Sequence, residues 1–239
     1  MRNCYAQVIT SFWCFIHSLF LLKIQPLKHV IITGGTGGLG RAIAQRFTVA
    51  GWRVSALGSS DLDLMDREKV SKYLSRHGCN LLVCAAGIVR DKLVAQMSEE
   101  NWDDVFEVNF QAARIPALCA LREMMAKGEG HVVFISSYSA EHPNVGQAAY
   151  STAKAALIGL TKELAAEAGS AGVRVNCLMP GFLETSMTDS LSHNQRLDIR
   201  TRHALAEFNT PDRVAEFIYF LEQQMTMTSG QCFNLDSRL

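Results

Sequence analysis

Tyr150 and Lys154 are the residues of this chain best suited to acid–base chemistry. Residues four apart on a helix lie on one face, so an ammonium at one position can lie near a phenol at the other. Nearby positive charge lowers the pKa of a phenol from about 10, and such a tyrosine can exchange a proton near neutral pH. Ser137 ends the preceding apolar run and can point its hydroxyl at the same substrate oxygen. The three groups predict proton transfer at a carbonyl.

A glycine-rich segment far upstream, residues 34–40, is a second signal that bears on these three groups. It reads G-G-T-G-G-L-G, follows an apolar run at residues 28–33 and precedes a helical pattern at residues 41–47. Glycines between a strand and a helix let the backbone approach a pyrophosphate, whose charge then meets the positive end of the helix. Either signal alone is weak, because glycine clusters and Tyr-x-x-x-Lys spacings also occur by chance. Together they predict a dinucleotide-dependent reaction.

The elements that must position these residues alternate between apolar runs and helical patterns. Strands are expected near residues 28–33, 52–57, 80–84, 131–135, 172–179 and 231–235. The alternation predicts an α/β fold, a single doubly wound parallel sheet of the Rossmann type with about seven strands. Residues 61–66 follow the second strand directly and leave no room for a crossover helix and a full third strand, so we expect the sheet to be abbreviated there.

Other segments carry helix signals. Asp66 can cap a helix. Residues 99–127 form a long helical pattern that contains Asn109, and Pro116 is expected to interrupt it. The polar residues 188–203 are expected to form a mobile lid over a substrate, because loops at this edge of such sheets carry function.

Composition disfavours several classes of function. Lys+Arg and Asp+Glu both total 23 among 239 residues, so the zero formal charge suggests neither nucleic acid nor an anionic surface as a partner. The seven cysteines lie in apolar runs without the spacing of metal ligands. We therefore expect no metal site, and reduced thiols in a reducing, cytoplasmic compartment.

Residues 1–27 form an apolar N-terminal extension. Polar residues interrupt its apolar run, which falls short of the roughly 20 apolar residues that a spanning helix needs, and no signal-peptide cleavage site follows. It is either a weak membrane or partner helix or an extension from an early start codon. We favour the second, with membrane contact not expected, because Pro26 separates it from a strand that can open a domain at residues 28–239.

The end of the second expected strand bears on the coenzyme. An acidic residue there would bind the adenosine ribose of NAD, whereas a basic one would favour the extra phosphate of NADP. This chain has Gly58-Ser59-Ser60 there, whose hydroxyls can accompany a phosphate that Arg41 or Arg53 could reach. The pattern leans to NADP without excluding NAD.

Residues 28–236 resemble the short-chain dehydrogenase/reductase family, whose motifs they carry in the family's order and spacing. These motifs are T-G-x-x-x-G-x-G from Thr33 to Gly40, A-A-G from Ala85 to Gly87, then Asn109, Ser137, Tyr150 and Lys154, and Pro180-Gly181 with Thr185. Within the family the chain is most similar to the 3-oxoacyl-carrier-protein reductases, through G-I-V-R-D-K-L at residues 87–93, E-E-N-W-D-D-V at residues 99–105 and P-G-F-L-E-T-S-M-T at residues 180–188.

The resemblance implies a role for each matching residue. Tyr150 would be the general acid, Lys154 would lower its pKa and bind the nicotinamide ribose, and Ser137 would orient the carbonyl. Asn109 would hold a water that connects Lys154 to solvent. The resemblance implies cofactor binding by Gly34, Thr36, Gly38, Leu39, Gly40, Asp63, Leu64, Ala85, Ala86, Gly87, Tyr150, Lys154, Pro180, Gly181, Leu183 and Thr185. In the reductive direction, hydride would reach the carbonyl carbon as Tyr150 gives up its proton.

The implied activity is NAD(P)H-dependent reduction of a ketone to an alcohol. The expected substrate is a 3-oxoacyl thioester of fatty acid biosynthesis, linked to a carrier protein or to CoA, and the expected assembly is a homodimer or homotetramer. The alternatives are a catalytically weak or inactive dinucleotide-binding sensor or scaffold, and an enzyme for another small alcohol or ketone.

Three departures from the family's pattern bear on these alternatives. Cys84-Ala85 stands where the family has Asn-Asn, and residues 235–239 lack the usual glycine pair. Carrier-protein reductases tend to have basic residues just before the Ser-bearing strand and at the turn before the next strand. At these two places this chain has only Lys127 to meet an acidic carrier.

Overall fold

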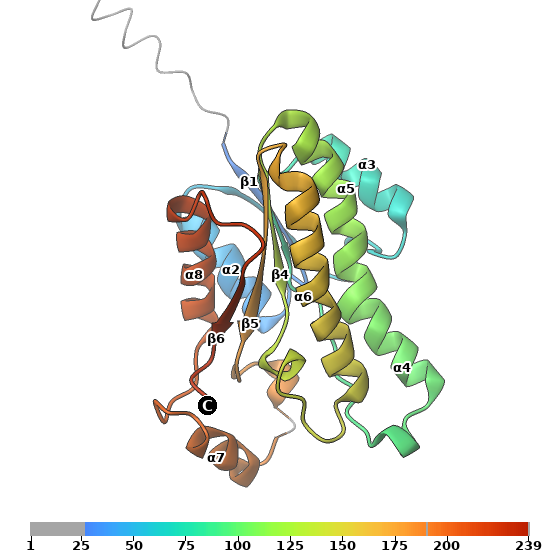
Figure 1. Cartoon of the computed structure of the whole chain (residues 1–239), viewed down its shortest axis with the longest axis vertical. Coiled ribbons are helices and arrows are strands. Elements are labelled where there is room, and N and C mark those ends of the chain that lie inside the picture. Colours follow the sequence, from blue (N-terminus) through green and yellow to red (C-terminus); the bar gives the residue numbers. More distant parts are fainter. Residues whose placement is uncertain (1–26, 190, 239) are drawn as a thin grey trace, which may run out of the picture.

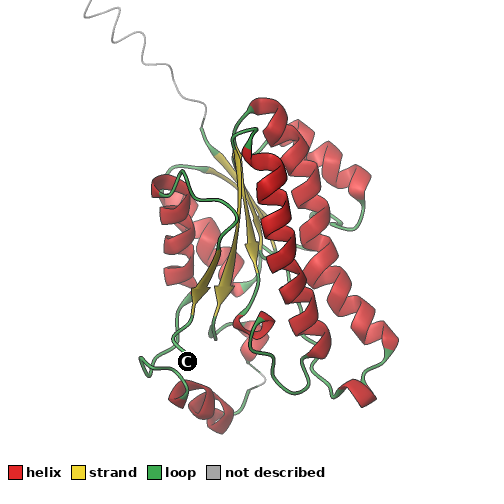
Figure 2. Ribbon diagram, in the orientation of Figure 1, coloured by secondary structure: helices red, strands yellow, loops and turns green. Residues whose placement is uncertain are grey.

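The chain folds into a parallel sheet with helices on both faces (Figures 1 and 2). The computed structural model describes residues 27–189 and 191–238. Residues 1–26, and with them nearly all of the predicted apolar extension, lie outside the described residues. In the described part of the chain, no helix is both long enough and apolar enough to cross a membrane.

Six strands within the described residues form the sheet, in the order β2-β1-β3-β4-β5-β6, and each neighbouring pair is parallel. They are β1 (His29–Thr33), β2 (Arg53–Leu57), β3 (Leu81–Cys84), β4 (Gly130–Ile135), β5 (Val173–Pro180) and β6 (Cys232–Leu235). The predicted α/β fold with a doubly wound parallel sheet is confirmed, and so is the predicted abbreviation after the second strand. The abbreviation leaves β2 as an edge strand and sends the chain through one helix directly to β3, so the described sheet has six strands where about seven were expected.

The helices divide between the two faces of the sheet (Figure 1). One face carries α2 (Gly38–Val49) and α8 (Pro211–Gln224), and the other carries α3 (Arg67–His77), α5 (Ala112–Lys127) and α6 (Ala148–Gly169). Side chains of a buried strand alternate between the two faces. In β1, Val30 and Ile32 pack with Phe47 of α2, whereas Ile31 packs in the second core with Leu157 of α6.

The long helical region runs on without a break in the chain. A π-helical turn, Glu107–Gln111, joins α4 (Glu99–Phe106) to α5, and it contains Asn109. Pro116 lies inside α5 and does not end it, contrary to the prediction. Proline has no backbone N–H, so α5 lacks one intrahelical hydrogen bond at Pro116. The turns on either side of Pro116 in the 16-residue helix are retained.

Two other predicted helical segments contain helices where the pattern placed them. Asp66 caps α3, with its side chain accepting a hydrogen bond from the backbone N–H of Lys69. The predicted lid region contains the helix α7 (His193–Thr201), which Ser192 caps through a reciprocal pair of bonds with Gln195. The mobility of this region stays a prediction.

The glycine turn between β1 and α2 is held by close backbone contacts. Gly34 has φ +66°, a left-handed conformation that favours glycine, and it packs on the backbone of Ala86. A Cβ on Gly40 would overlap the carbonyl oxygen of Gly34 and lie 2.7 Å from the Cα of Gly35. The first turn of α2 can therefore lie this close to the end of β1 only with glycine at position 40.

We expect Gly40→Ala to destabilise the fold by about 1–3 kcal/mol, because a side chain forced into a packed contact shifts the backbone. Dinucleotide binding should weaken with it. Gly159→Ala is the matched control, since Gly159 is exposed within α6 and has nothing within 4 Å of the added carbon; it should stabilise by about 0.5–1 kcal/mol. Urea unfolding and NADPH fluorescence titration measure both effects. Equal stability of the two variants would contradict this account of the turn.

Candidate active site

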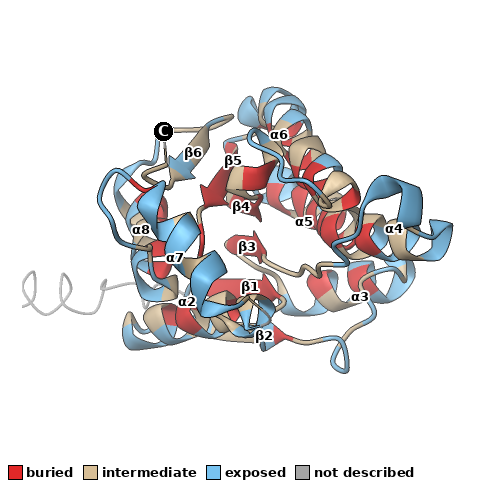
Figure 3. Ribbon diagram, turned by 90° about the horizontal axis from the view of Figure 1, so that it is seen from below, coloured by how far each residue is buried: buried red, intermediate tan, exposed pale blue. Residues whose placement is uncertain are grey.

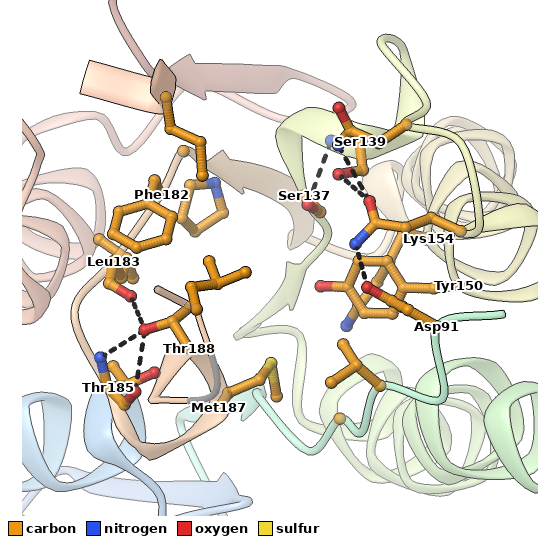
Figure 4. A pocket seen from close by; sticks show the side chains of 18 of the residues that line it. Asp91, Ser137, Ser139, Tyr150, Lys154, Phe182, Leu183, Thr185, Met187 and Thr188 are labelled. Carbon is orange, nitrogen blue, oxygen red and sulfur yellow. Dashed lines mark hydrogen bonds between the residues drawn. The ribbon is translucent and has the colours of Figure 1, made fainter. Parts of the chain in front are cut away.

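A cavity of about 1070 Å³ lies at the carboxyl ends of the strands. Figure 3 views the molecule from this end, and α7 lies beside the opening. The order of the strands reverses between β1 and β3, and open α/β sheets bind ligands at such a switch point. The close-up in Figure 4 shows Ser137, Tyr150 and Lys154 on one side of the cavity.

Two hydrogen bonds fix the start of α6 against the end of β4. The Lys154 ammonium donates to the backbone oxygen of Ile135 at 2.9 Å, and the Ser136 hydroxyl donates to the backbone oxygen of Lys154 at 2.7 Å. Tyr150 lies one helical turn before Lys154, and Ser137 directly follows Ser136. The phenol and the serine hydroxyl are thereby brought to the same wall of the cavity.

The predicted pairing of Tyr150 and Lys154 holds in position but not in its effect on the phenol. The Lys154 nitrogen lies 5.8 Å from the centroid of the Tyr150 ring. Burial raises the pKa of Tyr150 above its ordinary value, and a hydrogen bond with Ser137 partly offsets the rise. Burial also lowers the pKa of Lys154 to about 8, against smaller effects of Cys177 and Cys84. Tyr150 therefore stays protonated at neutral pH, as a proton donor must.

Asn109 joins the helical π turn to the segment after β3. Its side-chain nitrogen donates to the backbone oxygens of Ile88 at 2.8 Å and Val105 at 2.9 Å, and its oxygen accepts from the backbone N–H of Ile88 at 3.3 Å. A Cβ on Gly87 would lie 2.8 Å from that oxygen and 3.5 Å from the Lys154 nitrogen. Asn109 and Lys154 are thus close neighbours behind Gly87, while the water bridge between them stays a prediction.

The residues predicted to bind a cofactor divide into two groups. Those that line the cavity together with Tyr150 and Lys154 are Gly38, Leu39, Gly87, Pro180, Gly181, Leu183 and Thr185. The others lie around the cavity without lining it. Gly34 packs on Ala86, Gly40 packs on Gly34, and Thr36 lies beside Gly58. Leu64 packs against one core and Ala85 against the other, and the exposed Asp63 accepts a hydrogen bond from the backbone N–H of Met65. The structure therefore does not bring Asp63 and Leu64 to the cavity wall.

The residues present fit a dinucleotide at the start of α2. Gly37 occupies the N-cap position, where it provides no side-chain acceptor for the first N–H groups of the helix. These groups are the usual partners of an anion at a helix N-terminus. Gly38 and Leu39 line the same cavity as Tyr150, so the turn can hold a pyrophosphate with the rest of the cofactor extending toward the phenol.

One basic residue lies elsewhere than the sequence suggested. Arg53 begins β2 and donates to the backbone oxygen of His77, at the opposite end of the strand from the glycine turn, so it cannot reach an adenosine phosphate there. Arg41 donates to the backbone oxygen of Thr36 in the glycine turn and stays near the predicted phosphate. Lys127 ends α5 just before β4, as predicted, and its contact with a carrier stays a prediction.

Sequence reasoning missed a polar network under the serine loop. The Gln147 side chain donates to Asp91 at 2.9 Å and accepts from the Ser139 hydroxyl at 3.1 Å, and the backbone N–H of Ser139 donates to the Ser137 hydroxyl at 3.1 Å. Figure 4 shows this chain of contacts beside Tyr150. Asp91 and Gln147 are 56 residues apart, so their spacing carried no local signal.

Arg238, near the end of the chain, was also missed. Its guanidinium carbon lies 3.7 Å from the centroid of the Tyr138 ring, and its Nε donates to Asp236 at 3.1 Å. Arg238 lines the cavity together with Ser137. The sequence showed only that the usual glycine pair was missing from the tail; where the tail folds is a tertiary contact that no local pattern encodes.

Comparison with known proteins identifies the family. Residues 59–196 match the family model described as short chain dehydrogenase. The chain is 36% identical over 227 residues to the 3-oxoacyl-(acyl-carrier-protein) reductase FabG of Aquifex aeolicus, covering 84% of this chain and 91% of the relative. It is 32% identical over 220 residues to the Escherichia coli protein of the same name, covering 81% and 89%.

Solved structures agree with this assignment. An oxidoreductase of the short chain dehydrogenase/reductase family from Burkholderia thailandensis has a TM-score of 0.82 at 27% identity, covering 89% of this chain and 92% of that one. A Beutenbergia cavernae protein with bound NADP at low occupancy has a TM-score of 0.84 at 29% identity, covering 88% and 95%. The chain belongs to the short-chain dehydrogenase/reductase family. It is an NAD(P)-dependent oxidoreductase of that family.

The buried charge of Lys154 predicts a pH dependence of stability. The pKa of Lys154 is about 8 in the folded protein and near 10.5 in the unfolded chain. Between these values the unfolded chain holds the proton that the folded protein has lost, so stability rises with pH, by about 3 kcal/mol in all. Below pH 8 this contribution is absent.

Lys154→Met removes this titration. The free energy of unfolding of the variant, measured in urea without coenzyme, should fall relative to wild type by about 3 kcal/mol between pH 8 and pH 10.5. Lys162→Met, at an exposed position of the same helix, is the control and should follow the wild type. A constant difference between Lys154→Met and wild type over this range would show that the Lys154 charge is not desolvated.

Proposed function

We propose that this chain reduces the ketone of a 3-oxoacyl thioester with NADPH, and that Tyr150 is the proton donor. The observation that carries the proposal is the meeting of Ser137, Tyr150 and Lys154 in one cavity that also contains the start of α2. When bound there, the coenzyme supplies hydride to the carbonyl carbon. Tyr150 then gives its proton to the carbonyl oxygen, and the Ser137 hydroxyl orients that oxygen.

The shape and charge of the cavity support an acyl thioester as the substrate. The wall facing Tyr150 includes the apolar side chains of Phe182, Leu183 and Met187 (Figure 4), against which an aliphatic chain can pack. Arg90 and Arg202 line the cavity and are exposed, so they can attract the phosphates of CoA or of a carrier's prosthetic arm. The relatives in Aquifex aeolicus and Escherichia coli carry the name of a reductase for this substrate class.

We also propose NADP as the coenzyme. Arg41 lies at the glycine turn, and the hydroxyls of Ser59 and Ser60 follow β2, where the adenosine ribose of such cofactors binds. The Asp61 carboxylate accepts a bond from the backbone N–H of Gly58 at 2.7 Å, which engages the acidic group that would otherwise favour NAD.

We propose further that the protein is a homodimer or homotetramer and that it acts in the cytoplasm. Membership of the family supports the assembly, and light scattering of the full chain tests it. The described cysteines are free thiols, as in proteins of a reducing compartment.

Tyr150→Phe should lower kcat for NADPH-dependent reduction of acetoacetyl-CoA by about 10²- to 10⁴-fold, because the proton donor is lost. NADPH binding should persist. Tyr73→Phe, on α3 away from the cavity, is the matched control and should keep wild-type turnover. Unchanged turnover in Tyr150→Phe would refute the mechanism. Coenzyme binding by wild type without turnover of any ketone or alcohol in a panel would instead support the sensor alternative.

Arg41→Ala should raise the KM for NADPH about tenfold and leave the KM for NADH nearly unchanged, because a charged hydrogen bond to the extra phosphate is worth about 1.5 kcal/mol or more. Arg53→Ala is the control, since Arg53 lies at the start of β2, at the opposite end of that strand from Ser59 and Ser60. Steady-state kinetics with both coenzymes measures the ratio. If Arg41→Ala affects the two coenzymes equally, Arg41 does not read the phosphate.

A further inference from the structure

Two cysteines lie opposite each other at the edge of the sheet. Cys177 of β5 and Cys232 of β6 occupy the same register position of a parallel pair. Both pack into the core under α5 and α6, and each thiol is close enough to shift the pKa of the other. Neighbouring strands are about 4.8 Å apart, within the roughly 4.4–6.8 Å between Cα atoms that a disulfide can bridge. A bond between the two sulfurs therefore needs little movement of the backbone.

The two thiols differ in their surroundings. Cys177 is fully buried, whereas Cys232 is partly exposed on the edge strand. The neighbouring Cys177 thiol lowers the pKa of Cys232, and the Lys162 ammonium lowers it further, against the opposing effects of burial and of Glu141. The Cys232 thiol and burial raise the pKa of Cys177. An accessible thiolate beside a buried thiol is the arrangement found in peroxide-reactive cysteine pairs.

The other cysteines of the described residues lack this combination. Burial raises the pKa of Cys79 to about 12 and that of Cys84 further still, and Cys119 is buried in the core. Cys84 and Cys119 are buried, and Cys79, although partly exposed as Cys232 is, keeps its proton because of its raised pKa. Neutral or buried thiols react slowly with oxidants, so selectivity for the pair on β5 and β6 follows from the lowered pKa of Cys232 and from its neighbour Cys177.

We infer that Cys232 and Cys177 form a modification site at which a hydroperoxide makes an intramolecular disulfide. The Cys232 thiolate attacks the peroxide, the O–O bond breaks, and Cys232 becomes a sulfenic acid as one water is released. The Cys177 thiol then attacks that sulfur, the S–S bond forms, and the sulfenic oxygen leaves as a second water. Two thiols lose two electrons and two protons, and hydrogen peroxide accepts both.

The position of the pair gives the bond a structural consequence. The chain between Cys177 and Cys232 contains α7, α8 and the residues of β5 that lead into Pro180 and Gly181 of the cavity wall. A disulfide would close this whole segment into a loop and restrict the unfolded chain, so the oxidised protein should melt at a higher temperature than the reduced one.

The test is oxidation of the full chain with a small excess of hydrogen peroxide, followed by peptide mapping without reductant. We expect a mass about 2 Da lower, a Cys177–Cys232 cross-linked peptide, and reversal by dithiothreitol. Mapping assigns the bond among all seven cysteines and needs no variant. Sulfinic acid at Cys232 with Cys177 still a thiol, a bond between two chains, or two unreacted thiols would each overturn the inference.

Variants separate the roles of the two thiols. Cys232→Ser should abolish the cross-link, whereas Cys177→Ser should leave a sulfenic acid at Cys232 that a dimedone probe traps. Cys119→Ser is the matched control, a buried cysteine outside the pair, and should form the bond as wild type does. Loss of the bond in the control, or trapping of dimedone at Cys84 rather than Cys232, would contradict the assignment.

Discussion

The contact between Lys154 and the end of β4 is the interaction on which the site depends. Its ammonium donates to the oxygen of Ile135, and its own backbone oxygen accepts from Ser136. These bonds fix the angle and height of α6 on the sheet, and with them the phenol of Tyr150. They also account for the small residues around them, since α6 contributes fully buried alanines, Ala149 and Ala153, where larger side chains would hold the helix away from the strand.

This geometry has an energetic cost that the fold must offset. Burial lowers the pKa of Lys154 and raises that of Tyr150, so both groups are held in surroundings that disfavour their charged forms. The two cores on either face of the sheet supply the compensating apolar burial. A phenol with a raised pKa thus lies near an ammonium with a lowered pKa. Pairs of groups whose pKa values are shifted in opposite directions are common in acid–base sites.

The sequence predicted those features that local pattern encodes. Apolar runs located the strands, the glycine cluster located the turn between β1 and α2, and the spacing of Tyr150 and Lys154 placed both on one helix face. It failed where a residue's position depends on distant parts of the chain. Arg53 lies at the end of β2 away from the glycine turn because strand direction fixes which end it occupies, and the strand count depended on which neighbour β2 would have. The phenol's pKa depended on burial, which spacing cannot give.

The tail shows how one such distant contact completes the cavity. The side chain of Asp236 is fully buried and lies against Gly181, where any added side chain would overlap its carboxylate. Burial alone would raise the pKa of Asp236, but hydrogen bonds from Arg238 and the nearby His203 bring it below its ordinary value, so the carboxylate is charged. His203 follows α7 and Gly181 follows β5, so this one carboxylate joins the region over the cavity to the sheet. The tail also puts the guanidinium of Arg238 on the ring of Tyr138, next to Ser137. The cavity wall is therefore built partly from residues near the end of the chain.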